Sequence, residues 1–168
     1  EPMMHEHAKT QSLYEYARSG RYPLGKIMET AELASSKDAT VLPELKKRLT
    51  DKDPVVRYWA VIGCTVLSDR AASAKTILIE LLRDDEISVR IAAAEALYFH
   101  SGTEKSLSAL RAALTSGNVM ARVQAHNVLE NMGGDAKGAI DDIRRVLKDD
   151  VRDGDYDVRA AKRILEKL

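Results

Sequence analysis

Residues 88–97 read SVRIAAAEAL, a valine–arginine pair followed by small residues and a leucine. A related stretch, DPVVR, occupies residues 53–57. The arginine recurs at four positions, which are Arg57, Arg90, Arg122 and Arg159. Successive arginines are 33, 32 and 37 residues apart. This spacing is typical of stacked helical hairpins, each of which is unable to bury its apolar face alone.

Two helix faces repeat together with these arginines. The first helix of each unit carries aliphatic residues four positions apart, which are Leu45/Leu49, Leu78/Leu82, Leu110/Leu114 and Ile143/Leu147. In the first three units the second helix carries alanine three positions after its arginine, at Ala60, Ala93 and Ala125. Aliphatic residues spaced in this way bury one helix face, and small residues let helices approach closely. The sequence therefore predicts an all-α fold, a right-handed α-solenoid of stacked antiparallel helix pairs.

The repeats predict one compact domain with two parts. Residues 41–168 are expected to form about four of these units, and residues 1–40, which fit the period poorly, an N-terminal helical cap or connector. Lys162 and Glu166 stand where earlier units have small or apolar residues, as a polar terminal unit requires. The longer last interval predicts a four-residue insertion in a loop. The chain starts at Glu1 rather than methionine, so we expect a piece of a longer protein or a processed product.

The charge balance narrows the classes of partner. The 168 residues include 26 basic and 26 acidic side chains, so no long-range field would attract nucleic acid or an anionic membrane surface. No apolar run approaches the ~18 residues that a membrane span requires. We therefore expect a protein partner, and neither nucleic acid nor membrane.

No segment carries a catalytic motif, and we expect no catalytic, cofactor-binding or metal-binding residue and no cofactor. Alternating acids in residues 149–157 resemble the first ligands of a calcium loop. The resemblance then fails, because Val158 replaces the required glycine and Ile164 the bidentate glutamate. Cys64 aligns with leucines of the next two units, which predicts a small buried residue rather than a nucleophile.

The histidines also lack the pattern of a metal site. His5 and His7 are two positions apart, so they do not share a helix face. His100 and His126 belong to different units, with no cysteine or carboxylate at ligand spacing. We expect the latter two to be ordinary surface or partly buried histidines.

The leucine-rich helix, the short turn with aspartate, and the valine–arginine pair before small residues resemble HEAT-like repeats over residues 41–168. In that family the arginine ties adjacent units together through carboxylates and carbonyls of the turns. The resemblance implies a structural role for four arginines, namely Arg57, Arg90, Arg122 and Arg159. Asp53 and Asp85 would be their acidic partners. Asn118 departs from the acidic pattern, so this ladder of contacts is expected to weaken at the third unit.

A narrower resemblance begins in the N-terminal segment. Residues 16–23 (YARSGRYP), 31–34 (AELA) and 57–63 (RYWAVIG) are similar to the helical tail appended to some bacterial sulfatases. The resemblance implies the C-terminal accessory domain of a sulfatase-like hydrolase, in a periplasmic or exported protein. The sulfatase nucleophile motif is absent from this sequence, so the catalytic domain of such a protein would lie outside it.

Aromatic residues make up only 5% of the chain, yet most lie in its first hundred residues. Five of them are a candidate partner surface, namely Tyr14, Tyr16, Tyr22, Tyr58 and Trp59. Tyrosine and tryptophan are enriched where proteins meet, which supports this interpretation. The alternative is that they pack the N-terminal helices onto the first repeat.

Together these features favour a non-catalytic helical-repeat scaffold or interaction module, with the sulfatase accessory domain as its specific form. A free-standing protein-binding adaptor is the alternative. A third hypothesis, from another class, is a HEAT-like enzyme that acts on damaged DNA bases or on bilins. The zero net charge argues against it, because a DNA-binding solenoid should carry a basic stripe.

Overall fold

The computed structural model describes residue 15, residues 22–147 and residues 156–168. All regular structure in these residues is helical, which confirms the predicted all-α solenoid. The α-helices are α3 (Leu24–Ser35), α4 (Leu42–Arg48), α5 (Pro54–Leu67), α6 (Lys75–Leu81), α7 (Ile87–Tyr98), α8 (Thr103–Leu114), α9 (Val119–Met132), α10 (Ile140–Val146) and α11 (Tyr156–Leu165). Short 3-10 helices cover Ala39–Val41, Ser68–Ala74 and Gly133–Ala139.

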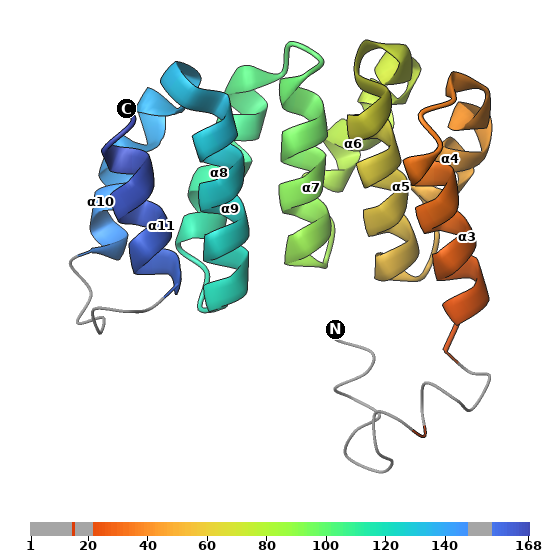
Figure 1. Cartoon of the computed structure of the whole chain (residues 1–168), viewed down its shortest axis with the longest axis horizontal. Coiled ribbons are helices and arrows are strands. Elements are labelled where there is room, and N and C mark those ends of the chain that lie inside the picture. The colour runs from red at the N-terminus through yellow and green to blue at the C-terminus, as the bar shows by residue number, and fades with distance from the viewer. Residues whose placement is uncertain (1–14, 16–21, 148–155) are drawn as a thin grey trace.

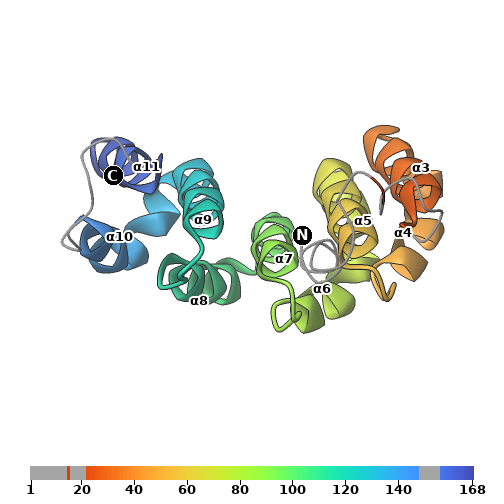
Figure 2. The same cartoon turned by 90° about the horizontal axis from the view of Figure 1, so that it is seen from below.

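The α-helices stand in two rows. Helices α3, α5, α7, α9 and α11 form one row, and α4, α6, α8 and α10 form the other (Figure 1). The stack is bent, and Figure 2 shows that the first of these rows lies on the concave side of the arc. We call this row the inner row. Because α3 stands in it and packs on α4 and α5, the described part of residues 1–40 continues the stack.

Residues in the turns between the two rows cap the N-termini of inner-row helices. The Asp53 carboxylate accepts hydrogen bonds from the backbone N–H groups of Val55 and Val56, and Pro54 occupies the first turn of α5. The Asn118 side chain caps α9 in the same way. Both arrangements satisfy N–H groups that have no partner within the helix. Glu86, at the same position before α7, makes no such side-chain bond.

Helix α7 lies between the two hydrophobic clusters of the described core. On one side, its residues Val89, Ala93 and Leu97 join a cluster built with α4, α5 and α6. On the other side, Ile91 and Ala94 join a cluster built with α8, α9, α10 and α11. The run of alanines in residues 92–96 makes this double burial possible, because small side chains allow helices to approach from both sides.

The close packing of α5 on α3 and α4 predicts a measurable effect at Gly63 in α5. A Cβ atom added there would lie 2.7 and 2.9 Å from the two δ-carbons of Leu45 and 3.1 Å from Cα of Ala34. Leu45 is fully buried, so a shift of its side chain would disturb the packed core around it. We expect Gly63→Ala to lower the free energy of unfolding by about 1–3 kcal/mol, because overpacking outweighs the better helix propensity of alanine.

Gly25→Ala is the matched control, since a Cβ atom at this position in α3 meets nothing within 4 Å. It should leave stability unchanged or raise it by up to about 1 kcal/mol. Urea unfolding followed by circular dichroism compares the two variants. Equal midpoints would contradict the proposed packing of α3, α4 and α5.

Candidate functional site

The arginine ladder is fully formed between the first two units. Arg57 donates from Nε and Nη2 to the two carboxylate oxygens of Asp84, both at 2.7 Å. Its Nη1 donates to the carbonyl oxygens of Asp51 and Lys52, at 2.8 and 3.1 Å, in the turn of its own unit. The hydrogen bonds that Arg57 donates to Asp84 are the main cause of its raised pKa. One side chain thus joins two successive turns by a bidentate ion pair.

The expected acidic partners of this arginine need correction. The hydrogen-bonded carboxylate is that of Asp84, not the exposed Asp85, whose contribution is a backbone carbonyl to Arg90. Asp53 does not bond to the arginine either, because its side chain caps α5. Asp84 is oriented for its role because Oδ1 also accepts the N–H of Glu86, two residues later.

The ladder lacks its carboxylate at Arg90. Arg90 donates to the carbonyls of Asp84 and Asp85 in its own turn, and no ion pair from it is found among the described residues. The residue corresponding to Asp84 in the next turn is Ser116, whose Oγ accepts the N–H of Asn118 just as Asp84 accepts that of Glu86. A hydroxyl in place of the carboxylate leaves Arg90 without a charged partner. The ladder is therefore weaker at the third unit, and Ser116 rather than Asn118 is the reason.

The ladder resumes at the end of the stack. Arg122 donates to the buried carboxylate of Asp157 at the start of α11, at 2.7 Å from Nε, and to the carbonyl of Ser116. The Arg159 guanidinium lies 4.8 Å above the centre of the Tyr156 ring. The turn before Arg159, including most of the acidic segment 149–157, lies outside the described residues.

An equivalent contact links α3 to the first turn. Lys26 forms an ion pair with Asp51, which corresponds to Asp84 in position. Arg48 of α4 reaches the Thr30 hydroxyl of α3 at 2.6 Å and pairs with Glu29. Asp51 and Asp84 therefore each receive a cation from the inner-row helix of the unit before, namely from α3 and α5. The sequence had not indicated that Lys26 belongs to the ladder.

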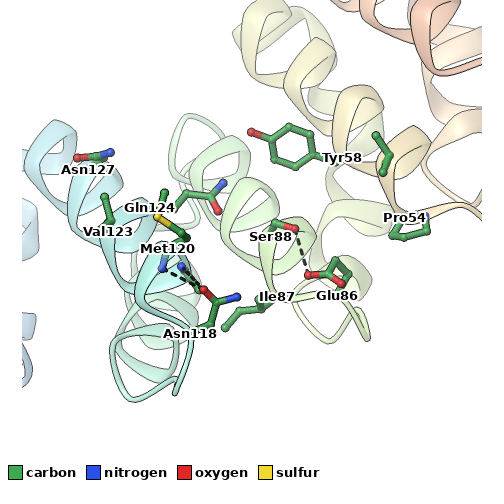
Figure 3. Close-up of a pocket in the computed structure, with 12 residues that line it drawn as sticks. Pro54, Tyr58, Glu86, Ile87, Ser88, Asn118, Met120, Val123, Gln124 and Asn127 are labelled. Atoms are coloured by element: carbon green, nitrogen blue, oxygen red, sulfur yellow. Dashed lines mark hydrogen bonds between the residues drawn. The ribbon is translucent and has the colours of Figure 1, made fainter. Parts of the chain in front are cut away.

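A groove opens on the concave side where α5, α7 and α9 adjoin (Figure 3). Its volume is about 520 Å³. The lining comes from the N-terminal halves of α5 and α9, the first residues of α7, and the residues just before α7 and α9: Pro54, Val55, Tyr58, Glu86, Ile87, Ser88, Asn118, Met120, Ala121, Val123, Gln124 and Asn127. Met120, which is 66% exposed, lies opposite Tyr58 across α7. We call this feature the inner groove.

The inner groove combines apolar and neutral polar groups with one charged residue. Ile87, Met120 and Val123 provide the apolar surface, and Ser88, Gln124 and Asn127 provide donors and acceptors. Glu86 is the only charged residue that lines it. Concave sites of this composition are typical of ligand-binding surfaces.

The five aromatic residues proposed as a partner surface are only partly placed. Tyr14 and Tyr16 lie outside the described residues, and Tyr22 is half-buried. Tyr58 and Trp59 are half-buried and meet edge to face, with ring centres 6.0 Å apart. Of the five, Tyr58 lines the inner groove. The equivalent positions in the next two units differ in role, because Ile91 is buried in the core and Val123 lines the groove.

The remaining candidates for chemistry do not assemble into a reactive centre among the described residues. Burial raises the pKa of the Cys64 thiol to about 11, which keeps it protonated at neutral pH. His100 and His126 are more buried than the surface or partly buried histidines that we expected, with 7% and 1% of their surface exposed. His5 and His7 lie outside the described residues. No group of three or more metal-ligating side chains is found in the described part of the chain.

Two comparisons with known proteins bear on this geometry. Residues 10–98 and 74–163 match the family model described as HEAT repeats. No curated protein gives a significant match to the chain. None of the described helices is both long and apolar enough to span a membrane.

The gap in the ladder predicts a stabilising substitution. Ser116→Asp should keep the turn hydrogen bond to Asn118 and place a carboxylate beside Arg90, as Asp84 lies beside Arg57. We expect the free energy of unfolding to rise by about 0.5–1.5 kcal/mol, the range for a partly exposed charge-assisted pair. Urea denaturation at low ionic strength measures the change.

Ser116→Asn is the control, since it supplies a side-chain acceptor for the turn without a charge. The gain of Ser116→Asp should also disappear when Arg90 is replaced by glutamine. A gain that persists without Arg90 would contradict the assignment of Ser116 as the missing ladder position.

The buried His126 predicts how stability depends on pH. The pKa of His126 in the folded chain is lowered to about 4, mainly by burial. In the unfolded chain a histidine takes up its second ring proton near pH 6.5. Between these values the unfolded state binds more protons, so the free energy of unfolding decreases as the pH falls from about 6.5 to about 4. The slope is at most about 1.4 kcal/mol per pH unit.

His126→Gln removes this titration and should flatten the dependence in that window. Urea unfolding at several pH values between 4 and 7.5 compares the variant with the original chain. Acidic residues whose pKa is lowered, such as Glu44, also lose their contribution to stability as the pH falls. They are present in both proteins, so they do not affect the difference between the two slopes. Identical slopes in the two proteins would show that His126 is not held neutral in the folded chain.

Proposed function

This chain belongs to the HEAT repeat family, and from that premise we propose that it is a protein-binding module whose inner groove holds a segment of a partner protein. A stack of helix pairs in this family is a scaffold or interaction module. The observation that carries the proposal is the inner groove itself, formed by three successive units on the concave side and lined by exposed Met120 beside half-buried Tyr58.

The composition of the inner groove supports a protein segment as the ligand. Its apolar wall of Ile87, Met120 and Val123 offers surface to a side chain. Gln124 presents an amide that can both donate to and accept from a peptide main chain, and Asn127, whose amide oxygen accepts from Arg163, adds N–H donors. The length of the groove, across α5, α7 and α9, suits an extended segment better than a small compact ligand.

Two narrower assignments follow from the sequence. The first is the accessory domain of a sulfatase-like hydrolase, for which the support is the N-terminal resemblance alone. Reading the coding sequence upstream of Glu1 tests it: a sulfatase domain there supports the assignment, and any other sequence contradicts it. The second is a free-standing adaptor. The described residues do not bring together side chains that could catalyse a reaction on DNA bases or on bilins. We therefore do not propose the enzyme hypothesis.

Selection from a displayed random peptide library tests the protein-binding role. Chemical shifts of the ¹⁵N-labelled chain should change at residues of α5, α7 and α9 that line the inner groove when a selected peptide is added. Met120→Arg should weaken binding about tenfold or more, because it places a long charged chain on the apolar wall.

Met28→Arg is the matched control, since Met28 is also an exposed methionine, at 54%, but lies on α3 outside the inner groove. It should leave the affinity unchanged. The proposed function would be overturned if peptides bound equally well to both variants and changed chemical shifts only outside the inner groove.

A further inference from the structure

The charged residue that lines the inner groove is a carboxylate without an ion pair in the described structure. Glu86 forms no ion pair within the described part of the chain, and its carboxylate accepts a hydrogen bond from the Ser88 hydroxyl at 3.3 Å. By contrast, the buried or half-buried carboxylates Asp84, Asp142 and Asp157 each pair with an arginine. The carboxylate in the groove is thus left for a cation from outside.

A second carboxylate lies further along the same helix. Glu95 of α7 is seven residues after Ser88, so it shares that residue's helix face. It is half-buried, and no ion pair is found for it among the described residues. Burial raises the pKa of Glu95 against the smaller, opposing effect of a hydrogen bond with the Asn131 side chain, and the charge of Glu95 contributes to the raised pKa of Tyr58.

The nearest basic side chains are directed elsewhere. Arg57 is held by Asp84 and by the carbonyls of its own turn. Arg90 donates to turn carbonyls, and Arg163 is bonded to Glu130 and to the Asn127 amide oxygen. None of them forms an ion pair with Glu86 or Glu95 in the described structure. Both carboxylates are half-buried and have already lost part of their hydration, so a bound cation would stabilise their charge.

Tyr58 and the apolar wall define the rest of the site. Tyr58 lines the groove together with Glu86 and Ile87, which lie at the start of α7 (Figure 3). Its ring can pack on the aliphatic stem of a lysine or arginine and attract the charged end. Ile87, Met120 and Val123 continue the groove as apolar surface suited to a neighbouring large side chain.

We propose that the inner groove selects a segment of a partner protein in which a lysine or arginine lies beside a large apolar residue. The cation pairs with Glu86 at the start of α7, where Tyr58 also lines the groove, and the apolar residue contacts Met120 and Val123. Glu95, further along α7, adds negative charge beside this site. This specificity rests on the proposed protein-binding function. It excludes acidic segments, because these two carboxylates, which form no ion pair in the described structure, would repel them.

Three fluorescent peptides of equal length, in a glycine–serine background, test the specificity on the full chain. The first contains Lys-Leu-Lys, the second Glu-Leu-Glu and the third Lys-Ser-Lys at the centre. Fluorescence anisotropy should show binding of the first peptide that is about tenfold tighter than that of either other peptide. The affinity should also fall as salt is added, because it depends on charge attraction.

Glu86→Gln and Glu95→Gln, singly and together, should each weaken binding of the first peptide about threefold or more and reduce its salt dependence. Glu104→Gln is the matched control, since Glu104 is an exposed glutamate on α8 outside the groove. Circular dichroism checks that the variants fold. If Glu95→Gln does not fold, Glu86→Gln alone tests whether a carboxylate in the groove binds the basic side chain.

The outcomes separate this inference from the proposed function. If the peptides bind in the inner groove, as judged by Met120→Arg, but with equal affinity for lysine and glutamate, the basic specificity is overturned and the protein-binding role stands. If Met120→Arg changes the binding of no peptide, both are overturned. Self-association that Met120→Arg abolishes, measured by sedimentation equilibrium, would show a second copy as the occupant and overturn the inference.

Discussion

The burial of α7 on both of its sides is the constraint on which the stack depends. No helix pair here encloses its own core, because each buries its apolar face against its neighbours. Helix α7 is the only described helix that contributes central residues to both hydrophobic clusters, through Val89 and Leu97 on one side and Ile91 on the other. The two halves of the chain are therefore stabilised through this one helix.

The polar contacts between units follow the same geometry but are distributed unevenly. The bidentate pair of Arg57 and Asp84 joins the first two units, and Arg122 with Asp157 joins the last two. Between the second and third units, at Ser116, the corresponding pair is missing. Apolar packing of α7 on α8 and α9 holds that junction, and the inner groove spans it. A segment bound there would contact both halves of the chain at once.

The periodicity of the arginines and leucines was sufficient to predict the helices, their pairing and most of the core. It could not decide between Asp84 and Asp85, because adjacent acids in a turn look alike until the backbone orients one of them. The inner groove was also beyond the sequence, since it depends on the curvature of three units. His126 shows a related limit: its place on a buried face follows from packing by α11 as well as from its own helix.

Native-state hydrogen exchange tests the central role of α7 most directly. Backbone amides of α7 should exchange only through global unfolding, and so show the highest protection in the chain, because both clusters must open to expose them. Amides of α3 and α11, which have a neighbour on one side only in the described structure, should exchange faster by local opening. Protection of α7 that is no higher than that of α3 would contradict the account, since the two halves would then unfold independently of their shared helix.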